Sequence, residues 1–385
     1  MSGAAPVPVT VTALRALPRE RFLSLDVLRG MTIFLMILVN TSGPGAPAYA
    51  QLVHADWFGF TLADLVFPTF LFVTGNALAF GSAQEDNTAF LRRVLKRALL
   101  IFLCGYLMYW YPFVQQVDGA WQFKPFAQTR VFGVLQRIAI CYLLAALAVR
   151  YLPAKLLPWL VLALPLAYWG ILHAFGPPGA ALDRHQNAGT QLDLWLVGVD
   201  HLYRKDHGFD PEGLLGSLPA TANVLGGYLA GRWLRDNGKS TRAVGWMLIA
   251  GGGLVLLALA WNPWFPIGKK LWTGPFVLLT VGLDLVWLAL LVWWIELRGH
   301  AGGSTFFTVL GKNPLAIYLF SELLVVTLQL VQVAPGRGLY DWLGIAVFQA
   351  ALPGPAGSLL CALAYTLCCW VLGWWMDRRR IYIRL

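Results

Sequence analysis

Residues 25–80 read LDVLRGMTIFLMILVNTSGPGAPAYAQLVHADWFGFTLADLVFPTFLFVTGNALAF, which is two long apolar segments, 25–39 and 58–80, joined by a short polar one. No Lys or Arg occurs between Arg29 and Arg92. Ionisable groups beside hydrocarbon are costly, so they indicate a functional site by default. The polar groups concerned are Asn40, His54, Asp56, Trp57 and Asp64.

The composition of the whole chain is that of a membrane protein. Hydrophobic residues make up 58% of the 385 residues and charged residues only 12%, against about 25% charged in an average soluble domain. We therefore expect a multi-pass protein in a lipid bilayer. The net charge of +10 then reports loop orientation, and we expect no nucleic-acid partner.

Apolar runs of spanning length predict an all-α transmembrane bundle of about ten helices. Two glycines four residues apart, Gly227 and Gly231, predict a close helix contact. The expected spans are residues 24–41, 59–80, 94–112, 130–150, 157–175, 214–234, 243–262, 274–296, 306–332 and 357–376.

The distribution of Lys and Arg predicts the orientation of the bundle. If the N-terminus is cytoplasmic, the inner loops carry more than twice as many of these residues as the outer ones. Both termini should then be cytoplasmic and His54 extracytoplasmic. We expect residues 1–20 to be a short cytoplasmic tail and residues 21–385 to form one transmembrane domain.

His54 is the strongest candidate for chemistry. A neutral imidazole can act as a general base, a nucleophile, a proton relay or a metal ligand. Asp56 and Asp64 follow it closely, and either could orient the ring. The other histidines are scattered, with no pair at helical spacing, so we expect no metal.

Asn40 ends the first apolar segment and allows two interpretations. Asn terminates helices well, and Gly43, Pro44 and Gly45 follow it, which is typical of a helix C-cap. Alternatively, its amide could donate a hydrogen bond to a developing oxyanion.

Basic and amide residues also occur at or within the predicted spans. Asp26 and Arg29 are three residues apart and can pair on one helix face, and Arg29 could instead meet a phosphate-bearing ligand. Gln136 and Arg137 enter an apolar helix, where a buried arginine needs a partner. Lys312 and Asn313 precede Pro314, a combination that favours broken backbone beside a cavity.

The ordered strings resemble the heparan-alpha-glucosaminide N-acetyltransferase family. SLDVLRG (24–30) leading to ILVN (37–40) is similar to the family's first span, and HADWFG (54–59) leading to TLADLVFP (61–68) is the most specific match. GVLQRI (133–138), DPEGLL (210–215) and KKLWT (269–273) continue it in order. The resemblance runs from about residue 21 to the C-terminus.

The resemblance implies an acyltransferase that moves acetyl from cytoplasmic acetyl-CoA, its co-substrate, to a glucosamine amine on the far side of the membrane. The lysosomal members carry a large luminal domain before the first shared span. The chain looks like the short bacterial members, which implies a bacterial inner membrane and an amino sugar such as glucosamine.

The resemblance also implies roles for individual residues. His54 would be the catalytic histidine and Asn40 its partner. From the residues themselves we also expect Asp64 to be catalytic, and either Asp56 or Asp64 could orient the imidazole. The expected donor-binding residues are Arg29, Gln136, Arg137, Lys312 and Asn313. The expected acceptor-binding residues are Asp56, Trp57, Glu212, Lys269 and Lys270.

One alternative from another class is an amino-sugar transporter without acyltransfer chemistry, which about ten helices and a Pro-broken span would also suit. The protein could form a homodimer in either case.

Overall fold

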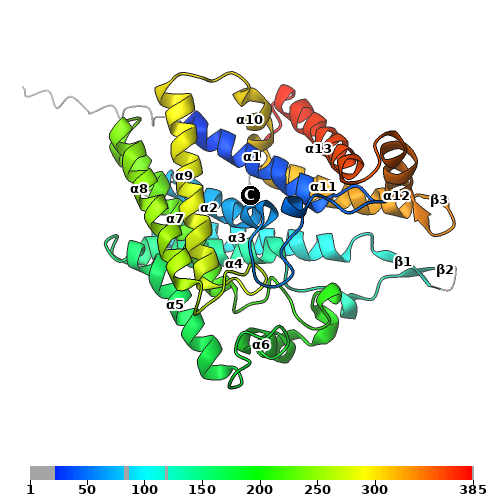
Figure 1. Cartoon of the computed structure of the whole chain (residues 1–385), viewed down its shortest axis with the longest axis horizontal. Coiled ribbons are helices and arrows are strands. Elements are labelled where there is room, and N and C mark those ends of the chain that lie inside the picture. The colour runs from blue at the N-terminus through cyan, green and yellow to red at the C-terminus, as the bar shows by residue number, and fades with distance from the viewer. Residues whose placement is uncertain (1–21, 82–85, 118–119, 384–385) are drawn as a thin grey trace, which may run out of the picture.

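The computed structural model describes residues 22–81, 86–117 and 120–383, and these are mostly helical (Figure 1). The predicted tail, residues 1–20, lies outside the described residues. The helices are α1 (Leu23–Asn40), α2 (Leu62–Ala79), α3 (Asn87–Trp110), α4 (Val134–Tyr151), α5 (Leu157–Phe175), α6 (Ala188–Val197), α7 (Ser217–Asn237), α8 (Thr241–Trp261), α9 (Gly274–Leu291), α10 (Ser304–Lys312), α11 (Pro314–Leu330), α12 (Leu339–Leu343) and α13 (Pro355–Arg378).

Shorter elements decorate this bundle. Two antiparallel hairpins, which an all-α fold did not predict, pair β1 (Val114–Val117) with β2 (Ala120–Phe123) and β3 (Gln332–Ala334) with β4 (Arg337–Gly338). Both hairpins lie in loops beyond helix ends. Single 3-10 turns occur at Ala50–Leu52, Phe126–Gln128, Val199–His201 and Arg204–Asp206, and π-helical turns at Val292–Leu297 and Gly344–Gln349.

Each of the ten predicted spans contains a helix, but fewer meet a strict test for crossing a membrane. Among the described residues, seven helices are long and apolar enough, or eight if α10 and α11 count as one bent span. The charged residues Arg93, Lys96 and Arg97 weaken α3, and α7 is rich in small and polar residues. The protein is thus multi-pass, and the count of about ten stays a prediction.

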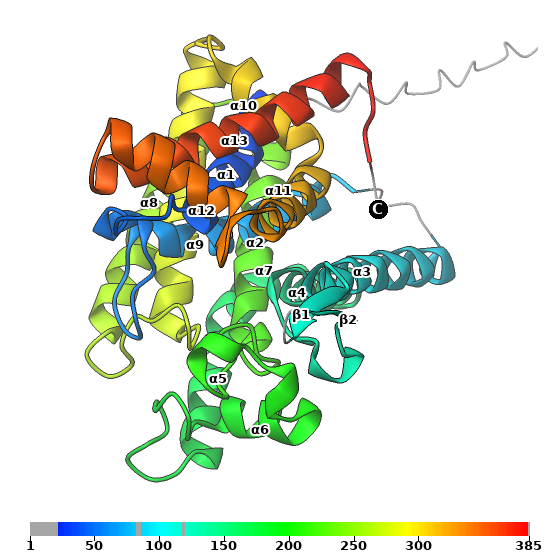
Figure 2. The same cartoon turned by 90° about the vertical axis from the view of Figure 1, so that its right-hand side faces the viewer.

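Small residues let α7 pack directly on α2. A Cβ atom at Gly227 would overlap the carbonyl oxygen of Phe72, and one at Gly75 would overlap the carbonyl oxygen of Val224. A Cβ at Gly231 would lie 2.9 Å from the side chain of Ala79. The predicted close contact at Gly227 and Gly231 is therefore confirmed. It fixes α2, whose first turn carries part of the site, against the centre of the bundle (Figure 2).

The break at Pro314 redirects the chain. The axes of α10 and α11 differ by 82°, because proline cannot continue the hydrogen bonding of α10. Asn313 is fully buried at the break, where its Nδ2 donates to the carbonyl of Ile381 and its Oδ1 accepts from the backbone of Ile383. The last described residues are thereby held against the break, and α11 runs off in a new direction.

Candidate active site

The carboxylate of Asp64 is held by the N-terminal cap of α2. Its Oδ2 accepts a hydrogen bond from the backbone N of Thr61 at 3.0 Å, which is one half of a capping box. The hydroxyl of Thr61 lies 3.1 Å from the same oxygen. The backbone N of Ala55 donates a further hydrogen bond to it at 3.2 Å. The other oxygen, Oδ1, lies 2.9 Å from Nδ1 of His54. Because a carboxylate only accepts, this contact places the proton on Nδ1 and leaves the lone pair on Nε2.

Lys269 also contacts the imidazole. Its Nζ is 2.8 Å from Nε2 and 3.1 Å from Nδ1 of His54, and a hydrogen bond of 2.8 Å from the backbone N of Gly59 to the carbonyl of Ile267 joins the two loops. Burial lowers the pKa of Lys269 to about 8, against the attraction of Glu212 and Asp64. His54 therefore sits between a fixed carboxylate and an amine that can titrate near neutral pH.

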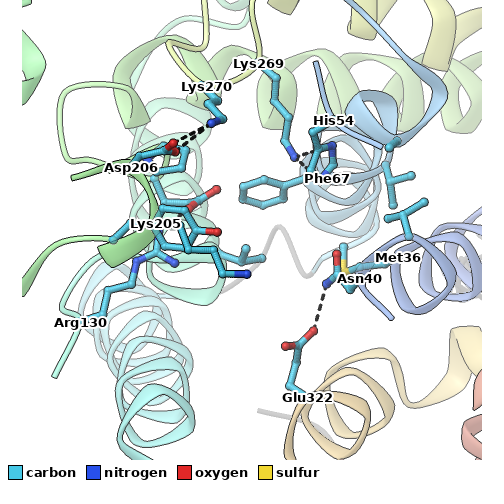
Figure 3. Close-up of a pocket in the computed structure, with 17 residues that line it drawn as sticks. Met36, Asn40, His54, Phe67, Arg130, Lys205, Asp206, Lys269, Lys270 and Glu322 are labelled. Carbon is cyan, nitrogen blue, oxygen red and sulfur yellow. Dashed lines mark hydrogen bonds and ion pairs between the residues drawn. The ribbon is translucent and has the colours of Figure 1, made fainter. Parts of the chain in front are cut away.

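Asn40 and His54 line one cavity of about 500 Å³, which we call the outer cavity (Figure 3). Asn40 ends α1, as the sequence predicts, and its Nδ2 donates to Oε1 of Glu322 in α11 at 3.0 Å. One amide hydrogen of Asn40 stays available to a ligand. The C-cap residue of α1 is Thr41, so Asn40 is the last helical residue and not the predicted C-cap, and the proposal that its amide donates to an oxyanion stays a prediction.

The opposite wall of the outer cavity is an ordered network of charges. Arg130 donates to both Asp210 and Glu212, with 2.9 Å between its Nε and Oδ2 of Asp210. Lys270 donates to both carboxylate oxygens of Asp206 at 2.9 Å. Burial alone would raise the pKa of Glu212, but Arg130 holds it below its usual range, whereas burial keeps the pKa of Asp210 raised.

Two of the expected acceptor-binding residues point elsewhere. The carboxylate of Asp56 is 88% exposed and pairs with Arg184 at 3.1 Å. The indole of Trp57 donates to the carbonyl of Leu182 at 3.2 Å and its ring packs edge-on against Phe209. Both residues thus hold the loop between α5 and α7 over the site. Glu212, Lys269 and Lys270 do line the outer cavity.

A second cavity of about 930 Å³, the inner cavity, lies toward the other end of the bundle. Three basic residues line it, Arg29, Arg97 and Lys312. Arg29 also contacts Asp26 at 3.2 Å, which confirms the predicted pair, and Lys312 pairs with Asp377 at 2.8 Å. The Nε atom of Arg97 is buried and has no partner among the described residues.

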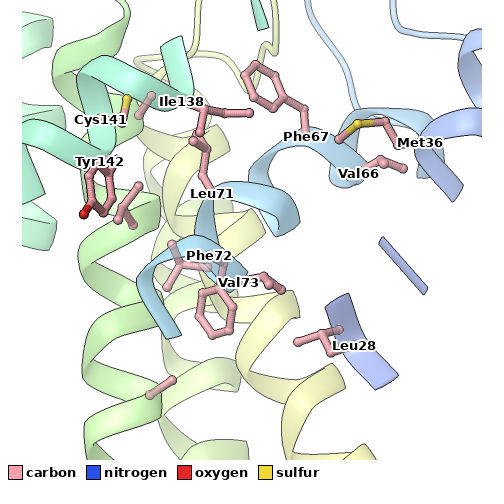
Figure 4. Close-up of a cluster of buried hydrophobic side chains, with 14 of the residues drawn as sticks. Leu28, Met36, Val66, Phe67, Leu71, Phe72, Val73, Ile138, Cys141 and Tyr142 are labelled. Atoms are coloured by element: carbon pink, nitrogen blue, oxygen red, sulfur yellow. The ribbon is translucent and has the colours of Figure 1, made fainter. Parts of the chain in front are cut away.

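A thin apolar layer separates the two cavities. On α2, Phe67 lines the outer cavity and Phe70 the inner one, and on α4 the adjacent Val134 and Leu135 divide in the same way. Three residues of helix correspond to about 4.5 Å. Figure 4 shows the part of the hydrophobic core made by α1, α2 and α4, in which Phe67 belongs to the lining of the outer cavity and Ile138 to that of the inner one.

The remaining expected donor-binding residues are fully buried. Arg137 donates to the carbonyl of Gly213 at 2.9 Å and stacks on Trp272, with 4.9 Å from its Cζ to the ring centroid. These partners belong to loops on the His54 side. Gln136 is buried beside Gly105, and its amide has no partner within the described part of the chain. Asn313 binds the C-terminal segment, as described above.

Glu322 and Arg97 line the two cavities but were not predicted as site residues. A lone carboxylate within the otherwise apolar α11 was a readable signal for Glu322. In the sequence Arg97 is one of several neighbouring basic residues and has no distinguishing pattern. In the structure its guanidinium packs over the ring of Tyr142 beside the inner cavity. In residues 22–81, 86–117 and 120–383 no group of three His, Cys, Asp or Glu side chains could hold a metal ion.

Comparison with known proteins adds an independent finding. The model of a family described as heparan-alpha-glucosaminide N-acetyltransferase, catalytic, matches residues 21–257. Proteins named heparan-alpha-glucosaminide N-acetyltransferase from Homo sapiens and Mus musculus are each 26% identical to the chain, over 370 and 364 residues. The matches cover 80% and 79% of this chain and 54% of each relative, so the chain spans about half the length of the curated relatives it matches.

Proposed function

Because the chain belongs to the heparan-alpha-glucosaminide N-acetyltransferase family, we propose that it transfers an acetyl group from acetyl-CoA to the amine of a glucosamine-type sugar. The observation that carries this proposal is the pair of cavities. One is basic and the other contains His54 and Asn40, and about one helical turn of α2 separates them. A donor bound in the inner cavity would need to pass only its thioester end through the apolar layer.

The inner cavity suits the phosphates of CoA. Arg29, Arg97 and Lys312 can each offer charge-assisted hydrogen bonds to phosphate. The free Nε of Arg97 supports this assignment. Gln136, Arg137 and Asn313 are proposed to act on donor binding indirectly, because their side chains hold neighbouring backbone or lie buried against it.

The outer cavity suits acyl transfer. In a direct mechanism the amine nitrogen attacks the acetyl carbon, and Nε2 of His54 takes a proton and passes it to the departing sulfur. Asn40 would donate its free amide hydrogen to the oxyanion. Asp64 would hold the imidazole in the required tautomer. In a two-step mechanism, Nε2 itself attacks the thioester, and the amine then attacks the acetyl-histidine.

We further propose that acetyl-CoA binds from the cytoplasm and that the sugar binds on the extracytoplasmic side of a bacterial inner membrane. The Lys and Arg distribution supports this orientation. Phe22 at the start of α1 and Tyr382 near the C-terminus both line the inner cavity, which supports placing both ends of the chain on one side. A homodimer stays a prediction.

The test is transfer by the purified protein in proteoliposomes of known orientation. Acetylated glucosamine should form when acetyl-CoA is supplied on the side of the inner cavity and the sugar on the other side. Free CoA thiol should appear only when an amino sugar is present. Uptake of labelled glucosamine without acetyl-CoA, and without acetylation, would instead support the transporter alternative.

A further inference from the structure

Glu322 is a carboxylate of the outer cavity, and no cationic partner for it occurs among the described residues. It lies half-buried in α11, among apolar residues, and its Oε1 accepts a hydrogen bond from Asn40 at 3.0 Å. Within the described residues no Lys or Arg pairs with it. A partly buried carboxylate without a compensating charge is costly, so its position calls for a reason.

Most other charged groups of the cavity have partners, and Lys205, which also lines the cavity, forms no ion pair with Glu322 among the described residues. Arg130 serves Asp210 and Glu212, Lys270 serves Asp206, and Lys269 contacts His54. Figure 3 shows Lys269, Lys270 and Asp206 above and across the cavity from Glu322, which approaches Asn40 from below. The cation that Glu322 lacks can therefore be supplied by a ligand.

We propose that Glu322 binds the ammonium group of the acceptor sugar and determines the preference for an amine. This inference rests on the proposed function. A carboxylate and an ammonium form a strong charge-assisted hydrogen bond. Because Asn40 bonds to Glu322, an amine held by this carboxylate would lie next to the group proposed to stabilise the oxyanion. The acceptor nitrogen and the acetyl carbonyl would thus be brought together.

The proton balance of the reaction gives Glu322 a second task. The acceptor arrives as an ammonium and leaves as an amide, so two N–H bonds break for each C–N bond that forms. His54 can accept one proton and deliver it to sulfur as the C–S bond breaks. Glu322 takes the other proton, which frees the nitrogen lone pair for attack, and later releases it to water on the outer side.

The same contact provides specificity. A sugar with a hydroxyl in place of the amine would leave the carboxylate of Glu322 without a counter-charge. A site built around a polar group of its ligand rejects the analogue lacking that group, because the protein group is then left unpaired. Glucosamine should therefore bind more tightly than glucose.

The experiment measures dissociation constants of glucosamine and glucose for the purified protein and for Glu322→Gln. Wild type should prefer glucosamine. In E322Q the affinity for glucosamine should fall roughly 10- to 100-fold, the range for one charge-assisted hydrogen bond, while the affinity for glucose changes little. Glu322→Asp should restore part of the preference. Asp236→Asn, at an exposed surface ion pair of α7, is the matched control and should behave as wild type.

Equal weakening of both sugars, or unchanged glucosamine binding in E322Q, would overturn the proposal. If E322Q loses binding of both sugars and its thermal midpoint falls, the variant is unstable and the test passes to E322D. E322D keeps the charge and must then still prefer glucosamine. Sugar binding is measured without acetyl-CoA, so it is independent of turnover. A wild-type protein that prefers glucosamine through Glu322 but transfers no acetyl would refute the proposed function and leave this inference standing.

Discussion

The Nδ1 atom of His54 lies 2.9 Å from Oδ1 of Asp64, a fully buried carboxylate at the third position of α2. The same carboxylate closes the capping box with Thr61. The helix cap that starts α2 therefore also orients the imidazole. Because one carboxylate both caps the helix and orients His54, a substitution of Asp64 alone would affect both roles, and a second variant is needed to distinguish them.

Asp64→Asn should reduce turnover on the order of 10³- to 10⁴-fold, as expected when a histidine loses the carboxylate that fixes its tautomer. Thr61→Ala weakens the cap without removing the contact with His54. It should lower stability by roughly 0.5–2 kcal/mol and keep most of the turnover. Steady-state kinetics and thermal unfolding of both variants provide the check. Equal loss of turnover in the two would mean that Asp64 acts only through the helix cap.

His54→Ala should abolish acetyl transfer and leave acetyl-CoA binding nearly intact, because the interactions of a base or nucleophile are made mainly in the transition state. The measurement is acetylation of glucosamine, with donor binding followed by calorimetry in parallel. Wild-type turnover in this variant would remove the acyltransfer mechanism proposed here.

Asn40→Ala should lower turnover roughly 10²- to 10³-fold if the amide stabilises an oxyanion. Asn40→Asp should be at least as poor, since it removes the donor and places a negative charge beside Glu322 and the oxyanion. The affinity for acetyl-CoA is the control and should not change. A defect confined to protein stability would instead indicate that Asn40 serves only to end α1 and to bind Glu322.

Donor binding can be tested by comparing three arginines. Arg29→Ala and Arg97→Ala should each weaken acetyl-CoA binding by about 1.5–3 kcal/mol, the value of a charge-assisted contact. Arg137→Ala should instead lower stability, because Arg137 supports Gly213 and Trp272 from within the core. Titration calorimetry with thermal unfolding distinguishes the two effects. If the Arg137 variant loses affinity for acetyl-CoA but keeps its stability, Arg137 contacts the donor directly.

The sequence predicted most helices, and it indicated Asn40 and His54, which line one cavity; their catalytic roles stay predictions. Both results depend on local pattern. Apolar runs reveal helices, and a polar residue that ends such a run is visible without a structure. Asp64 was expected to be catalytic and Asp56 to bind the acceptor, and the spacing of Thr61 and Asp64, which is that of a capping box, also places Asp64 at a helix start.

Long-range contacts were beyond the sequence. Asn40 and Glu322 are 282 positions apart, and they meet because α11 turns by 82° after Asn313. Pro314 predicts a break but not its direction. The contact between Arg137 and Trp272 is also long-range. Without it, the sequence indicated only a buried arginine in need of a partner, and the donor was the partner expected.

The charges around Lys269 determine how we expect the transfer rate and the stability to depend on pH. Burial lowers its pKa to about 8, the carboxylates of Glu212 and Asp64 oppose this shift, and the positive charges of Arg137 and Lys270 add to it. Below about pH 8 Lys269 is an ammonium that donates to the imidazole. Above it, the neutral amine holds the imidazole less strongly.

For the wild-type protein, kcat/KM of the proposed transfer should therefore rise as the pH passes through about 8, because the ammonium of Lys269 otherwise occupies the Nε2 lone pair of His54 that must accept the proton. Lys269→Met should reach its plateau at a lower pH. Lys270→Met removes a neighbouring positive charge and should move the midpoint of the rise in kcat/KM to higher pH without abolishing it.

The stability of the protein should depend on the same group. Since the pKa of Lys269 is lower in the folded than in the unfolded state, the unfolded chain binds more protons at pH values between the two pKa values. The contribution of Lys269 to stability should therefore increase as the pH rises above about 8. Pre-steady-state rates and thermal midpoints measured over pH 6–10 test both statements, and a Lys269→Met profile identical to that of wild type would show that Lys269 does not control His54.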